Sequence, residues 1–276
     1  MGAGKKRKER FFRQHPYCCF CGGIRLAETE DHVPSRVFFI KRSRPDDFVF
    51  PACKSCNSIS SKSEQVTALL SRTSYQSEQI VDAPDFCKLV QAVHNNSKGT
   101  FQEMVGPRTG DKIIKRQIRA ALGSDDFHLL TFGSNARMHC QLFGAKLAFA
   151  FHYKFLGRPL PTDGGAIVSI HNQVDFALNR APHLEIAFND IESLRQGKWN
   201  SEGQFEYRMS LATDFEGGLF QAFFHKNLLF TLITSADGSK LLNEDVPVHV
   251  PGELKPVAEA IDPYRITATI SGRFAK

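Results

Sequence analysis

The chain has 276 residues, which suits one large domain or two smaller ones with a sizeable buried core. Its composition, 42% hydrophobic and 23% charged, is that of a globular protein. It contains no run of about 18 apolar residues, so we expect no membrane-spanning helix and no membrane partner. Residues 1–6 are basic but lead into no apolar segment, which argues against a secretory signal and favours a cytoplasmic protein.

The positive charge is concentrated at the N-terminal end. Residues 1–64 contain 13 Lys and Arg against 7 Asp and Glu, whereas residues 65–276 contain 22 of each, so the net charge of +6 lies wholly in the first part. A basic segment on a neutral body indicates a polyanionic partner. For the basic arm 1–16 alone, a solvated tail is an equally good interpretation.

The expected elements change in kind along the chain. Hydrophobic spacing predicts helices over 63–71, 82–93, 111–122 and 134–156, and strands over 166–170, 184–188, 205–211, 218–224 and 228–234. In the longest helix Phe143, Leu147, Phe151 and Phe155 share one face, which is typical of a core stripe. Residues 225–227 are expected to join two strands as a short hairpin.

The predicted fold class is therefore α+β. We divide the chain into the basic arm (1–16), a compact N-terminal module (17–65), a helical region (66–158) and a C-terminal region of mainly antiparallel sheet with helices (159–276). As an alternative to this division, residues 66–276 form a single domain. The module is poor in apolar residues and needs a staple to hold it together.

The cysteines supply that staple. Two CxxC pairs, Cys18 with Cys21 and Cys53 with Cys56, have the spacing of a closed tetrahedral Zn²⁺ site, which would be structural because it leaves no open position. An odd total of seven cysteines fits a reducing compartment. The three other cysteines are interpreted as a bystander and two buried apolar residues: Cys19, Cys87 and Cys140.

Candidate catalytic residues lie between and just after these pairs. Asp31 directly precedes His32, and Asn57 follows the last cysteine. A carboxylate and an amide oxygen suit Mg²⁺ or Mn²⁺, and a neutral imidazole suits a general base at neutral pH. Taken singly, Asp31-His32 fits an ordinary loop pair and Asn57 a residue that opens a helix.

The motifs Cys18-x-x-Cys21, Asp31-His32-x-Pro34 and Pro51-Ala52-Cys53-x-x-Cys56-Asn57 together resemble the zinc-containing branch of the HNH endonucleases, the ββα-metal nucleases. The resemblance covers residues 17–65. It implies a second strand at 48–50, a catalytic metal on Asp31 and Asn57, and His32 as general base. It also implies products with 5′-phosphate and 3′-hydroxyl ends, and a role in bacterial defence against phage or mobile DNA as one setting.

The chain departs from this family pattern at the residue that supports the general base. The family has an Asn there, whereas this chain has Asp47, with Asp46 as the fallback. The family's Lys after the final Asn corresponds to Lys62, displaced by a serine-rich stretch. Four further basic residues between the motif halves are expected to contact phosphates: Arg36, Lys41, Arg42 and Arg44. Their alternative is a solvated loop.

The resemblance therefore predicts a metal-dependent endonuclease that acts on nucleic acid, DNA in preference to RNA. Two other functions fit the same residues. One is a catalytically silent zinc module that binds nucleic acid or a protein. The other is a nuclease subunit that becomes active in a complex, with a protein partner bound through the C-terminal half. Residues 147–172 are only weakly similar to the tails of uncharacterised bacterial HNH proteins.

Overall fold

The computed structural model describes residues 3–73, 84–105, 132–172, 175, 191–196, 199–212, 216–241 and 246–259. It confirms a mixed helix and sheet fold. The helices of four residues or more are α1 (Ala3–Gln14), α2 (Lys54–Ile59), α3 (Ser61–Arg72), α5 (Pro84–Asn96), α6 (Lys98–Val105), α8 (Ser134–Leu156) and the 3-10 helix η4 (Gly238–Leu241). The predicted helix 111–122 and strand 184–188 fall outside the described residues.

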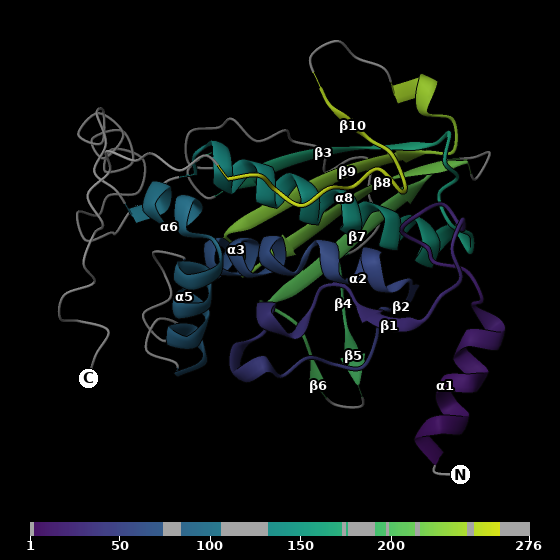
Figure 1. The fold of residues 1–276 in the computed structure, drawn as a ribbon, viewed down its shortest axis with the longest axis horizontal. Coiled ribbons are helices and arrows are strands. Elements are labelled where there is room, and N and C mark those ends of the chain that lie inside the picture. The colour runs from purple at the N-terminus through teal and green to yellow at the C-terminus, as the bar shows by residue number, and fades with distance from the viewer. Residues whose placement is uncertain are drawn as a thin grey trace.

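One antiparallel sheet forms the C-terminal layer. Its strand order is β10-β3-β9-β8-β7-β4, and α8 and α3 lie in front of it in Figure 1. The strands are β3 (Gly165–Asn172), β4 (Glu192–Ser193), β7 (Phe205–Leu211), β8 (Gly217–Phe224), β9 (Leu228–Ser235) and β10 (Val248–His249). A separate short ribbon pairs β5 (Arg195–Gln196) with β6 (Trp199–Asn200).

The predicted hairpin at 225–227 is confirmed. Phe224 of β8 pairs with Leu228 of β9, so three residues form the loop. His225 and Lys226 both adopt positive φ angles, 51° and 54°, which let the chain reverse in so short a loop. The predicted strand 205–211 corresponds to β7.

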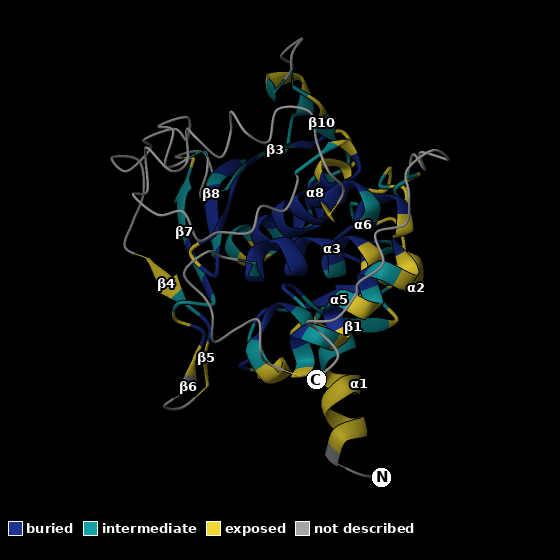
Figure 2. Ribbon diagram, turned by 90° about the vertical axis from the view of Figure 1, so that its left-hand side faces the viewer, coloured by how far each residue is buried: buried dark blue, intermediate teal, exposed yellow. Residues whose placement is uncertain are grey.

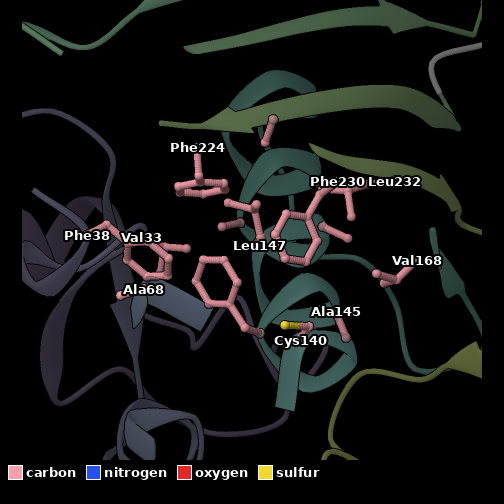
Figure 3. Packing of buried hydrophobic residues seen from close by; sticks show 14 of the residues in the cluster. Val33, Phe38, Ala68, Cys140, Ala145, Leu147, Val168, Phe224, Phe230 and Leu232 are labelled. Carbon is pink, nitrogen blue, oxygen red and sulfur yellow. The ribbon is translucent and has the colours of Figure 1, made fainter. Parts of the chain in front are cut away.

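The predicted helix 134–156 is likewise confirmed as α8. It ends where Gly157 adopts a left-handed conformation, φ 74°, and its N–H donates to the carbonyl of Tyr153. The Phe stripe packs into the core: the Phe143 ring lies 4.7 Å from that of Phe38 and 5.6 Å from that of Phe230. Figure 3 shows Phe38, Phe224 and Phe230 arranged around this helix near Leu147.

A second antiparallel pair, β1 (Thr29–His32) with β2 (Val49–Ala52), lies below α3 and α8 in Figure 1 and runs into α2. The buried apolar residues form one continuous cluster that extends from Cys18 to Leu232. The cluster therefore crosses the predicted boundaries between residues 65 and 66 and between residues 158 and 159. The hairpin therefore shares its core with the long helix and the sheet. Figure 2 shows that α1, in contrast, is exposed along most of its length.

Among the described residues, no helix combines the length and the apolar character needed to cross a membrane.

Candidate functional site

The two predicted CxxC pairs come together at one end of the hairpin. Cys18 and Cys21 lie in the turn that precedes β1, while Cys53 stands at the start of α2 and Cys56 lies within it. The four sulfur atoms all lie within 4.8 Å of one another. Three of the four residues are buried, and the donor set is all thiol. Such a cluster fits tetrahedral zinc in its ligand type and its closed surroundings.

The protonation of these thiols points the same way. A hydrogen bond from Cys56 lowers the pKa of Cys18 to about 5, whereas burial raises the pKa of Cys21 to about 11. Neighbouring thiols of this cluster therefore hold their protons with different strengths. A divalent ion that replaces those protons would satisfy the thiolates together, which is why metal binding in such clusters is coupled to folding.

Cys19 lies outside this set, as predicted. Its side chain is fully buried, and burial raises its pKa well above the usual value. A cysteine in apolar surroundings with a raised pKa is chemically inert, so Cys19 is a packing residue.

The hairpin and α2 bring Asp31 and Asn57 together. One end of the Asn57 amide lies 3.3 Å from both carboxylate oxygens of Asp31, and the other end lies 3.0 Å from the hydroxyl of Thr29. With its nitrogen toward Asp31 the amide donates to the carboxylate; with its oxygen there, as an ion shared by the two groups would require, its nitrogen donates to Thr29. Asp31 sits opposite Phe50 in the β1–β2 pair, and Asn57 lies in the last part of the short helix that follows β2. The predicted carboxylate and amide are therefore close enough to serve one ion.

Asp31 also belongs to a buried charge cluster that the sequence did not reveal. Its Oδ2 lies 2.6 Å from the ammonium of Lys146, which in turn lies 3.0 Å from Glu64 and donates to the hydroxyl of Ser60 at 2.8 Å. Asp31 is 6% exposed. Burial raises the pKa of Asp31, and the adjacent ammonium opposes that rise. One signal was present: Lys146 is the single charge in the middle of a long apolar helix, and such a charge requires a partner.

His32 points to the other face of β1, because successive side chains of a strand alternate. The imidazole is half-buried, and burial together with Arg44 and Arg36 lowers its pKa. A lowered pKa keeps the ring neutral at pH 7, the form that accepts a proton. In the part of the chain that is described here, no side chain hydrogen-bonds to this ring.

The structure does not bring Asp47 to His32. The Asp47 carboxylate accepts hydrogen bonds from the backbone N–H of Phe48 at 2.7 Å and from Lys154 at 3.2 Å. The fallback residue Asp46 is exposed, and its backbone N–H donates to Gln196. Asp46 acts on His32 through its charge, which opposes the lowering of the histidine pKa, and neither aspartate hydrogen-bonds to the ring.

Arg44 organises the loop between β1 and β2. It is 4% exposed, and its guanidinium donates to the carbonyl oxygens of Pro34 at 2.7 Å, Pro45 at 2.6 Å and Phe48 at 3.1 Å, with a further bond to Asp47. Backbone carbonyls take four of the five N–H donors of this buried guanidinium, so Arg44 is poorly placed to contact a phosphate. The remaining predicted phosphate contacts are exposed: Arg36, Lys41, Arg42 and Lys62.

No family model, no curated protein and no solved structure matches this chain. The zinc-type cysteine cluster and the proximity of Asp31 and Asn57 therefore carry the functional interpretation by themselves.

Proposed function

We propose that residues 17–65 form a zinc-stapled nuclease module that hydrolyses phosphodiester bonds of nucleic acid, DNA in preference to RNA. The observation that carries the proposal is the convergence of Asp31 and Asn57, whose side chains lie 3.3 Å apart beside the four-cysteine cluster. His32 is the next residue of β1 after Asp31. A carboxylate and an amide that can bind a hard cation, together with an imidazole that can act as a base, suit metal-assisted phosphodiester hydrolysis.

The donor set suits a hard cation. Asp31 and Asn57 would hold Mg²⁺ or Mn²⁺ through oxygen atoms, with the Asn57 oxygen turned toward Asp31 and its nitrogen donating to Thr29. The bound ion would neutralise charge on the phosphate and on the leaving 3′-oxygen. His32, neutral because burial lowers its pKa, would take the proton of the attacking water. The resemblance to HNH nucleases adds the expectation of 5′-phosphate and 3′-hydroxyl products.

A second function, a catalytically silent zinc module, is favoured by one observation. The buried ammonium of Lys146 already neutralises Asp31 at 2.6 Å, and a neutralised carboxylate attracts a divalent cation less strongly. In that case the module binds nucleic acid or a protein without cutting. An intermediate form, a nuclease active only after a partner binds the C-terminal half, requires Lys146 to release Asp31 in the complex.

Incubation of the purified full-length protein with supercoiled plasmid and Mg²⁺ or Mn²⁺ separates these functions. We expect nicked or linear product, a loss of about 10²–10⁴-fold in rate for His32→Ala, and none for the control His171→Ala, a half-buried histidine in β3. Ligase should reseal the nicks if the ends are 5′-phosphate and 3′-hydroxyl. Equal background cutting by wild type and His32→Ala would favour the silent module, and cutting only with a second protein would favour the complex.

A further inference from the structure

The helix α1 carries basic residues around most of its circumference, and three of them form one exposed face. Lys6, Arg10 and Arg13 follow one another at intervals of four and three residues, so they share one face of the helix. All three are exposed. Within the described chain, no carboxylate lies within ion-pair distance of any of them. Phe11 and Phe12 lie away from this face and are half-buried, and the exposed Lys8 lies on the same side as they do.

Two contacts attach α1 to the body and fix its direction. The guanidinium of Arg7 lies 2.8 Å from the carboxylate of Glu30, whose side chain is only 9% exposed. Immediately after the helix, His15 Nδ1 lies 2.7 Å from the hydroxyl of Tyr153, and its ring packs at 4.9 Å from that of Phe11. The helix is therefore attached at Arg7 and just beyond its C-terminal end, and Figure 2 shows it projecting from the body with most of its length exposed.

The attachment point relates α1 to the candidate site. Glu30 and His32 are two residues apart in β1, so their side chains lie on the same face of the strand. Arg7 therefore fixes the basic helix on the face that carries the imidazole, while Asp31 points to the opposite, buried face. A polyanion held along α1 would thus approach the face of β1 that carries His32.

We propose that α1 is a backbone-binding helix whose residues Lys6, Arg10 and Arg13 contact successive phosphates of duplex DNA beside the proposed cleavage site. Three exposed basic side chains on one face, without a carboxylate partner among the described residues, complement a row of phosphates in charge. Such contacts position a duplex without reading its sequence. Docking on an anionic lipid surface is disfavoured because that mode requires an exposed apolar side, and here Phe11 packs against His15. The inference rests on the proposed function for the identity of the polyanion.

The test measures binding without cleavage. In the His32→Ala background and without added Mg²⁺, the affinity for a fluorescent duplex is recorded against salt concentration for the full-length protein. Each lost phosphate contact reduces the salt slope by about 0.9, so the triple variant Lys6→Gln, Arg10→Gln, Arg13→Gln should lose roughly 2.7. The matched control removes three equally exposed charges elsewhere: Lys88→Gln, Lys98→Gln and Lys255→Gln.

The proposal holds if the slope falls in the triple variant and not in the control. It is overturned if the salt slope falls equally in the triple variant and the control, or if it changes in neither. It is also overturned if the triple variant weakens binding to anionic phospholipid vesicles or to duplex RNA but not to duplex DNA. Failure of the nuclease proposal is a separate result. A wild type that binds DNA through α1 without cutting refutes catalysis alone, and one that cuts with an unchanged slope refutes the role of α1 alone.

Discussion

Lys146, in the middle of α8, holds its ammonium nitrogen 2.6 Å from the carboxylate of Asp31 in β1. Both groups are buried, and Glu64 of α3 completes the cluster at 3.0 Å from the same nitrogen. One cation thus faces two carboxylates where the hairpin, α3 and α8 meet. The ion pair ties the residue on which the proposed metal site depends to the core helix of the protein.

Replacement of Lys146 by Met should be strongly destabilising. The variant leaves Asp31 and Glu64 buried without a counter-charge, and breaking a buried pair in this way costs about 3–5 kcal/mol of the free energy of unfolding. Urea denaturation measures this loss in the free energy of unfolding. The control is Lys154→Met, since the Lys154–Asp47 pair is more than a third exposed on both sides and should contribute at most about 1 kcal/mol. Equal losses in the two variants would contradict the assignment of Lys146 as the buried counter-ion.

Removal of a zinc ligand should unfold the N-terminal module. In Cys53→Ser we expect the bound zinc to be lost and the hairpin to become sensitive to protease, because the binding energy of a structural zinc is folding energy. Elemental analysis and limited proteolysis give the two readouts. Cys87→Ser, on the half-buried side of α5, serves as the control and should retain full zinc. A wild-type protein without stoichiometric zinc would refute the cluster as a metal site.

The sequence predicted those features that depend on local spacing. The two CxxC pairs identified the four clustered sulfurs, and an uninterrupted helical stripe identified α8 with its full extent. The partners of Asp31 and Asp47 were not predictable in this way. Lys146 reaches Asp31, and Lys154 reaches Asp47, only because α8 packs across the hairpin, and nothing near either aspartate in the sequence specifies that packing.

The pH dependence of stability should include a contribution from His225. Burial lowers the pKa of this histidine to about 4, although its Nε2 lies 2.6 Å from the carbonyl of Phe38. In the unfolded chain the pKa is about 6.5, so below that pH the unfolded state binds a proton that the folded state does not. The free energy of unfolding therefore falls as pH drops from about 6.5 to about 4, by roughly 3 kcal/mol for this one group.

Chemical denaturation of wild type and His225→Gln across this pH range isolates the effect. His152 has a similarly lowered pKa, about 4, and contributes to both proteins, so only the difference between the two curves belongs to His225. His94→Gln, a half-buried position on α5, is the control for the substitution itself. A His225→Gln curve parallel to that of wild type would show that its imidazole is not the buried neutral group described here.

Arg44 and Arg36 should differ in what they do, although both were predicted to contact phosphates. The guanidinium of Arg44 donates to backbone carbonyls of the loop between β1 and β2. Arg44→Gln leaves these buried acceptors unpaired and should therefore lower the free energy of unfolding by about 2–4 kcal/mol. Arg36 is exposed, so Arg36→Gln should change stability by less than about 0.5 kcal/mol.

DNA binding should depend on Arg36 and not on Arg44, the reverse of their effects on stability. If Arg36 contacts a phosphate, Arg36→Gln reduces the salt slope of duplex binding by about 0.9, whereas Arg44→Gln, measured well below its unfolding transition, leaves the slope unchanged because its donors never face solvent. Urea denaturation and fluorescence titration of the same two proteins give both readouts. A reduced slope with intact stability in Arg44→Gln would place its guanidinium at the surface and contradict the buried loop arrangement, since one side chain cannot bind these backbone carbonyls and a phosphate with the same donors.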